Sequence, residues 1–377
     1  MSATFDARRD PVFSTRIDAL RLFAILLTVV FHLQPTPSSP LARGLGDGWL
    51  LTKLYADSFL MPSGLMLFTT LTAYLQLSRA TPRPYLMLVR QWARRLLVPL
   101  VAFSLPVVLV VLALQVGGHF EGFHGHQLVP FHALAFVDAL VGLTRHPINV
   151  PLYFLKDVFL LLLISPGVAW LTRRTGPLLL VVVVAVDCLG LPAPIFQTWT
   201  LPTGFALGAW LEQRRDLLAV VDRRGPLFLL LAGAVASGLV FTLFLGAGPE
   251  RFTPPAWLEA ANRLAGAPAC WWLTRFLVGP PLARAVRWLQ TYSFPIFTMH
   301  AMCMAVLWTG FNATHQPPGS ALFWVYWLAT VPVGVAAPVA VALVAERVTP
   351  RAWAFMLGQS GAPAARATSP RSASAPD

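Results

Sequence analysis

The sequence predicts an all-α, polytopic membrane protein, a bundle of about ten transmembrane helices with both termini in the cytoplasm. This prediction depends on composition, on the length of the apolar blocks and on the placement of basic residues. Of 377 residues, 56% are hydrophobic and 12% are charged, and the mean hydropathy is +0.65. Soluble domains are about 45–50% apolar and about 25% charged. A soluble fold is therefore excluded.

The apolar residues form blocks of about the length that a helix needs to cross a bilayer, roughly 20 residues. Ten spans are predicted, at 17–34, 50–76, 93–116, 150–171, 177–191, 195–212, 226–247, 262–280, 291–311 and 321–345. Together they make one transmembrane domain over 17–345. Residues 1–16 are predicted to be a cytoplasmic segment. The polar, proline-containing tail 346–377 is predicted to be cytoplasmic and disordered.

Basic residues set the orientation of these spans. Of the 28 Lys and Arg, 20 fall on the side of the N-terminus and five, Arg263 among them, fall in the opposite loops. Cytoplasmic loops collect Lys and Arg, so both termini are predicted to lie inside. The same rule accounts for the net charge of +12 without a nucleic-acid partner.

Four polar residues recur along the first span, where ionisable groups are costly and therefore mark functional sites. They are Asp18, Arg21, Thr28 and His32. Arg21 and His32 are eleven residues apart, close to three helical turns, so the four share one stripe that should face the bundle interior. The alternative is an Asp–Arg pair at the interface and a histidine that only makes structural hydrogen bonds.

Three arginines, Arg90, Arg94 and Arg95, enter the third span from the cytoplasmic side. Arg90 and Arg94 lie one turn apart on one helical face. Like charges so placed repel each other, and guanidinium groups bind phosphates well, so an anionic ligand is one interpretation. A simple cytoplasmic anchor for the helix is the other.

Two further candidates lie inside spans. Lys156 and Asp157 require a local ion pair or partners on neighbouring helices, because each is an ionisable group placed in an apolar helix. His300 lies about two turns after Ser293 and is either a buried structural histidine or a member of a site. We expect no metal site in the loop that carries His119, Glu121, His124, His126 and His132, because the spacing matches no known ligand pattern.

Five segments in order resemble the membrane-bound acyltransferase 3 family. The opening RIDALRLFAILLTVVFHLQP is similar to the first helix of that family, in which ten residues separate an Arg and a His, here Arg21 and His32. The others are VRQWARRLLVPL, LYFLKDVFLLLLISP, LPTGFALGAWLEQRRDLLAVV and YSFPIFTMH. The chain departs from the family pattern at Trp92, where an Arg is usual, and at Thr72-Ala73-Tyr74, where Ser-Gly-Tyr is usual.

The resemblance implies an integral membrane enzyme of the bacterial cytoplasmic (inner) membrane. Such enzymes move an acyl group such as acetyl or succinyl from acyl-coenzyme A, a co-substrate, to a hydroxyl of an envelope carbohydrate or lipid. No tightly bound cofactor and no metal are expected. His32, Arg21 and Asp18 would be catalytic, with His32 as general base, and the three arginines would bind the donor. The alternative class is a secondary transporter or channel with a charged pathway.

Overall fold

The computed structural model describes residues 11–36, 39, 42, 44–78, 83–119, 122, 125–245 and 255–359. This part of the chain contains helices and no strand, which confirms the all-helical class. The α-helices are α1 (Pro11–Phe31), α2 (Gly46–Ser58), α3 (Met61–Leu77), α4 (Tyr85–Val116), α5 (Ala133–Val141), α6 (Tyr153–Thr175), α7 (Leu178–Cys188), α8 (Thr200–Gln213), α9 (Asp216–Leu245), α10 (Ala256–Leu273), α11 (Pro280–Gln290), α12 (Ser293–Ala313), α13 (Ala321–Val348) and α14 (Pro350–Met356). Of the two predicted terminal segments, residues 1–10 and 360–377 lie outside the described residues.

Every predicted span contains a helix, and six helical segments of the described chain are long and apolar enough to cross a membrane. They are Gly46–Leu77, Tyr85–Val116, Val150–Thr175, Asp216–Phe244, Ser293–Ala313 and Ala321–Val348. Helices α7 and α8 have 11 and 14 residues, fewer than the roughly 20 that a full crossing needs. A count of ten crossings and the cytoplasmic termini therefore stay predictions.

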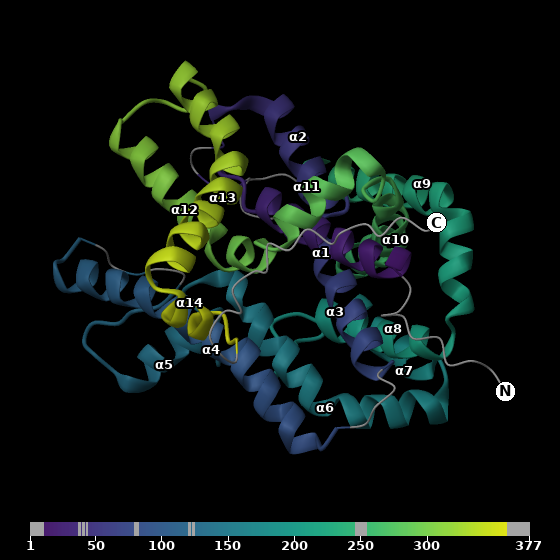
Figure 1. The fold of residues 1–377 in the computed structure, drawn as a ribbon. Helices are drawn as coiled ribbons and strands as arrows, with labels where there is room; N and C mark the ends of the chain where they lie inside the picture. Colours follow the sequence, from purple (N-terminus) through teal and green to yellow (C-terminus); the bar gives the residue numbers. More distant parts are fainter. Residues whose placement is uncertain are drawn as a thin grey trace, which may run out of the picture.

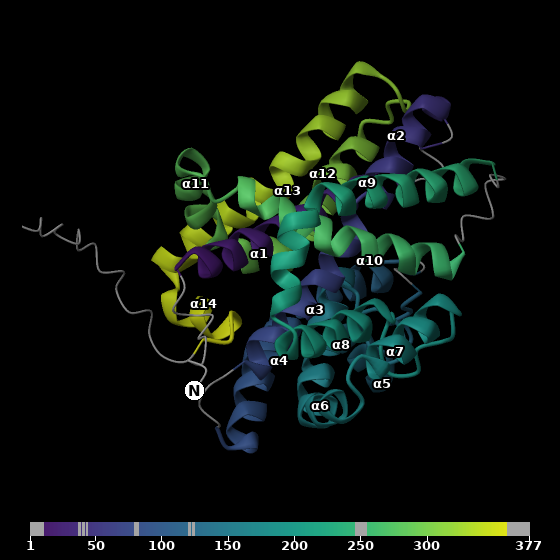
Figure 2. The ribbon, with the colours of Figure 1, turned by 90° about the vertical axis from the view of Figure 1, so that its right-hand side faces the viewer.

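Helix α1 lies in the middle of the bundle (Figure 1). It contacts α2, α3, α11, α12 and α13, so the polar stripe of the first predicted span is surrounded by other helices. Helices α12 and α13 pack against each other on one side of α1, and α9 and α10 pack together on another (Figure 2). This position is what an apolar helix with ionisable side chains requires in a bilayer.

The second predicted span is broken into α2 and α3. At the break Leu60 has a φ of 62°, in the left-handed region that a branched residue rarely adopts. The Asn262 amide donates a hydrogen bond to the carbonyl oxygen of Ser58, the last residue of α2. A side chain of α10 thus satisfies a backbone acceptor that the break exposes. Non-helical backbone in such a place is tolerated where it lines a cavity, as it does here.

Helices α3 and α8 approach each other closely through two glycines of α8. A Cβ atom on Gly204 would overlap the Met66 carbonyl oxygen, and one on Gly208 would overlap that of Thr70. Small residues at helix contacts let membrane helices pack backbone to backbone. Because α3 lines the candidate site described below, this contact also fixes one wall of that site.

Substitution of Gly208 with alanine should destabilise the protein by about 1–3 kcal/mol, because an overpacked contact forces the backbones of α3 and α8 apart. Thermal unfolding in detergent would measure the change. Gly238 of α9 is a matched control, since a Cβ there meets no atom within 4 Å. An alanine at position 208 as well tolerated as one at 238 would contradict this account of the contact.

Candidate active site

Two cavities meet beside α1. The first, the Arg21 cavity, has a volume of about 440 Å³ and lies between α1, α3, α4, α6 and the start of α12. Its polar and charged lining residues are Arg21, Thr28, Thr72, Gln76, Arg95, Gln290 and Ser293. The remaining wall is mainly aliphatic and aromatic and includes Trp92 and Phe154. Each of the two departures from the family pattern thus places a residue in the lining of this cavity, Thr72 on α3 and Trp92 on α4.

The second, the His32 cavity, has a volume of about 460 Å³. It is bounded by the end of α1, the break between α2 and α3, α10 and the segments that precede α6 and α8. Its polar lining residues are Thr28, His32, Asp57, Ser58, His146, Tyr153, Thr198, Thr200, Glu259, Asn262 and Arg263. More polar residues line this cavity than the first, eleven against seven.

Three residues, Thr28, Leu65 and Phe297, line both cavities, so the two are separated by a thin wall. Along α1, Arg21 lies on one side of that wall and His32 on the other, eleven residues further on. Eleven residues of α-helix correspond to about 16 Å. The single stripe predicted on the first helix thus reaches two neighbouring cavities.

His32 contacts a second histidine, His300 of α12. The two ring centroids are 5.0 Å apart, and His300 Nε2 lies 3.3 Å from His32 Nδ1. His300 is fully buried, and its Nδ1 lies 3.0 Å and 2.9 Å from the carbonyl oxygens of Ile296 and Phe297. The structure thereby places His300 directly beside His32, the candidate base of the first helix.

The carbonyl groups determine where the hydrogens of the two neutral rings lie. Carbonyl oxygens only accept, so His300 Nδ1 carries a hydrogen and His300 Nε2 carries a lone pair. His32 Nδ1 lies 2.8 Å from the Thr28 carbonyl oxygen and faces the His300 lone pair, so it too carries its hydrogen. His32 Nε2 is then the basic nitrogen of the pair. A histidine so oriented can take a proton from a ligand.

The predicted pair of Asp18 and Arg21 forms, with 3.6 Å between Arg21 Nη1 and Asp18 Oδ1. Both side chains are a little more than a third exposed, so this ion pair contributes at most about 1 kcal/mol to stability. Arg21 lines its cavity and Asp18 does not. Asp18 therefore acts on the site only through Arg21.

The three arginines of α4 have different surroundings. Arg95 lines the Arg21 cavity, whereas Arg90 is exposed and lines neither cavity. Arg94 Nη2 donates a hydrogen bond of 2.6 Å to the carbonyl oxygen of Gln359, just after α14. Gly358 packs against the same turn of α4 with a φ of +66°, which glycine adopts without strain. Of the three, Arg95 is the one in position to meet a ligand beside Arg21.

Lys156 and Asp157 line neither cavity. Lys156 Nζ lies 3.3 Å from Asp157 Oδ1 and donates to the Gly142 carbonyl oxygen at 2.8 Å. Asp157 Oδ2 accepts a 2.8 Å hydrogen bond from the backbone N–H of Gln197. The pair ties α6 to the segments that follow α5 and precede α8, which is a structural role near the site.

A buried charge network beside His32 has no counterpart in the sequence-based prediction. Arg263, predicted in a loop, lies in α10 with 7% of its surface exposed. Its guanidinium lies 2.8 Å from Asp187 of α7 and 3.3 Å from Glu259. The only sequence signal was the i,i+4 spacing of Glu259 and Arg263, one turn apart at the edge of an apolar block.

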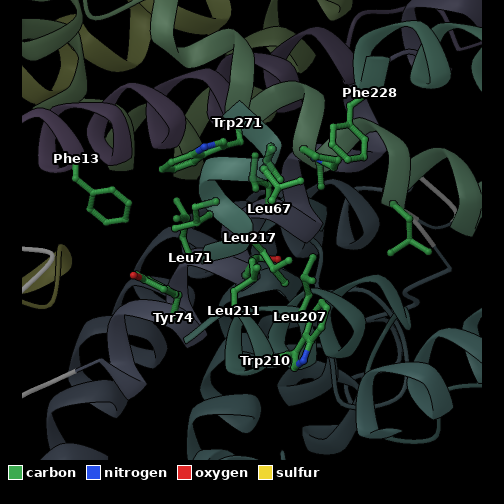
Figure 3. Close-up of a pocket in the computed structure, with 17 residues that line it drawn as sticks. Phe13, Leu67, Leu71, Tyr74, Leu207, Trp210, Leu211, Leu217, Phe228 and Trp271 are labelled. Carbon is green, nitrogen blue, oxygen red and sulfur yellow. The ribbon is translucent and has the colours of Figure 1, made fainter. Parts of the chain in front are cut away.

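A third cavity, of about 330 Å³, is lined by apolar side chains of α3, α8, α9 and α10, together with Phe13 (Figure 3). Its hydroxyl-bearing residues are Thr70 and Tyr74, and no acid, base or cation lines it. It offers no group for proton transfer. Within the described residues no group of three His, Cys, Asp or Glu could hold a metal ion; Glu121 and His124 lie outside that part.

The chain is similar to known proteins over nearly its whole length. The family model described as an acyltransferase domain matches residues 14–343, which includes both cavities and every candidate residue. The chain is 27% identical to the succinoglycan biosynthesis protein ExoH of Rhizobium meliloti (strain 1021), over 96% of each chain. No solved structure matches the chain. Because this family model covers nearly the whole of the helical bundle, the chain belongs to the acyltransferase 3 family.

Proposed function

We propose that this protein is an O-acyltransferase that moves an acyl group from acyl-coenzyme A to a hydroxyl of an envelope carbohydrate. The observation that carries the proposal is that the stripe on α1 places Arg21 in one cavity and His32 in the neighbouring one, with Thr28, Leu65 and Phe297 lining both. A donor in the first cavity and an acceptor in the second can then meet across this shared wall, with His32 on the acceptor side. The carbohydrate acceptor is suggested by the relative that functions in succinoglycan biosynthesis.

In this mechanism His32 Nε2 removes the proton of the acceptor hydroxyl as its oxygen attacks the thioester carbonyl carbon. The carbon–sulfur bond then breaks, and the imidazolium returns the proton to the sulfur of coenzyme A. A positioned general base contributes typically 10²–10⁴-fold, or about 3–5 kcal/mol of barrier. His300 is a positioning residue here, because its lone pair holds the Nδ1 hydrogen of His32 and keeps Nε2 basic.

The donor is assigned to the Arg21 cavity because two guanidinium groups, Arg21 and Arg95, line it. Arginine binds phosphate oxygens in charge-assisted pairs, and the nucleotide of coenzyme A carries several phosphates. The mainly apolar remainder of that cavity suits the pantetheine arm and the acyl chain. If α1 starts in the cytoplasm, the donor enters from inside and the acceptor lies toward the outside.

A transporter would also place ionisable groups inside the bundle, so the test must separate transfer from transport. Purified protein in detergent is incubated with acyl-coenzyme A labelled in the acyl group and with a soluble oligosaccharide. The proposal predicts label on the oligosaccharide and release of free coenzyme A. Solute flux in proteoliposomes without any acyl transfer would instead favour the transporter.

A further inference from the structure

The His32 cavity contains a ligand-binding surface on α10 that the reaction chemistry does not use. Glu259, Asn262 and Arg263 lie within about one helical turn of each other and all line the cavity. Asn262 and Arg263 are more than nine-tenths buried. Asn262 Oδ1 and Arg263 Nε have no hydrogen-bond partner in the described part of the chain. Two residues that line the cavity thus each carry a polar atom that the described part of the chain does not satisfy.

The charged groups of this cavity are all paired within the protein, with negative charge in excess. Arg263 is paired with Asp187 and Glu259, and Asp57 is paired with Lys53. Carboxylates therefore exceed cations by one around the cavity. An anionic ligand would meet no surplus positive charge here, and juxtaposed like charges are costly.

The imidazole of His146 adds no positive charge to this cavity. His146 lies in the segment between α5 and α6 and lines the cavity. Its partial burial, together with the charge of Lys156, lowers the pKa of the His146 imidazole below its usual range. At neutral pH this side chain is therefore neutral, and it offers hydrogen bonding without charge.

The cavity also presents aromatic surface next to these polar groups. Phe31, Tyr153 and Phe297 line it, and Phe31 is 49% exposed. The face of an aromatic ring carries partial negative charge and packs well against the weakly positive C–H groups of a sugar ring. Carboxylate and amide oxygens accept from sugar hydroxyls, while guanidinium and amide N–H groups donate to them.

We propose that Glu259, Asn262 and Arg263 form the acceptor-binding surface of the enzyme, and that this surface selects an uncharged, hydroxyl-rich sugar over an anionic one. The inference rests on the proposed function in that it treats the bound sugar as the acceptor of the reaction. Binding of the sugar itself requires neither the donor nor acyl transfer. The proposal assigns substrate discrimination to α10, a helix that carries none of the catalytic residues.

The test is equilibrium binding of an oligosaccharide to the protein in lipid nanodiscs, without any acyl donor. Binding is measured by saturation-transfer NMR titration. Two tetrasaccharides of equal length serve as probes, neutral cellotetraose and anionic tetragalacturonate. We expect cellotetraose to bind at least roughly tenfold more tightly, because the second probe brings carboxylates to a site with excess negative charge. Equal or tighter binding of tetragalacturonate, or no binding of either probe, would overturn the inference.

Variants locate the surface. Glu259→Gln should weaken cellotetraose binding about tenfold, the value of one hydrogen bond to a charged group, and should narrow the difference between the probes. Asn262→Ala should weaken cellotetraose binding to a similar degree. If loss of the hydrogen bond to Ser58 unfolds the Asn262→Ala variant, Glu259→Gln alone still decides the test. Glu346→Gln is the matched control, because Glu346 is an exposed residue of α13 and does not line the cavity. Unchanged binding in Glu259→Gln would place the surface elsewhere, whereas failure of the proposed function would show only in the transfer assay.

Discussion

Substitution of His32 with alanine is expected to lower kcat for acyl transfer by about two to four decades, the typical contribution of a general base. The loss should fall on the chemical step, because the donor phosphates are proposed to bind in the neighbouring cavity, at Arg21 and Arg95. Transfer of a labelled acyl group to an oligosaccharide measures kcat. Protein yield, thermal stability in detergent and acyl-coenzyme A binding should stay close to wild type.

Two glutamine variants separate a base from a structural histidine. His32→Gln keeps hydrogen-bonding capacity but cannot take a proton, so it should be as inactive as His32→Ala. His300→Gln should be milder, because its amide oxygen can still accept the hydrogen on His32 Nδ1. A stable and active His32→Gln enzyme would rule out the general-base role.

The second large effect is expected in the Arg21 cavity, where the donor is proposed to bind. Arg95→Ala should raise KM for acyl-coenzyme A by roughly tenfold to a hundredfold with little change in kcat, because a charge-assisted contact to phosphate is lost in both ground and transition states. Steady-state kinetics with a saturating acceptor would measure the change.

The control donor is an acyl-pantetheine thioester, which lacks the nucleotide and its phosphates. With this donor Arg95→Ala should differ little from wild type. Arg90→Ala is the matched protein control, since Arg90 lies on the same helix and lines neither cavity. Equal losses with both donors would mean that Arg95 merely anchors α4.

The sequence could predict the helices and the stripe on the first of them, because both follow from local periodicity. Composition and block length were enough for the all-helical class, and the eleven-residue spacing of Arg21 and His32 was enough to place both on one face. The break at Leu60 was not predicted, although Pro62 in the first turn of α3 is a local signal for a helix start. The hydrogen bond from Asn262 that supports the break comes from a distant helix and leaves no local signal. The short length of α7 and α8 could not be predicted, because apolar character alone does not limit it.

Some contacts within the candidate site could be predicted and others could not. His300 was a candidate, yet its contact with His32 joins residues 268 positions apart and leaves no trace in spacing. The three arginines of α4 were treated as one group, whereas the docking of Gln359 separates Arg94 from Arg95. Arg263 was missed because its partner Asp187 lies on another helix, and a cation at the edge of an apolar block is typical of a loop.

The most direct test of transfer between the two cavities uses sealed proteoliposomes that contain the purified protein. Labelled acyl-coenzyme A is added outside, and oligosaccharide is either trapped inside or supplied outside. The account predicts label only on trapped oligosaccharide, because it assigns donor and acceptor to two cavities separated by Thr28, Leu65 and Phe297 and proposes that they open to opposite sides of the membrane. Vesicles carrying His32→Gln should give no product in either case. Acylation only of oligosaccharide on the same face as the donor would contradict it.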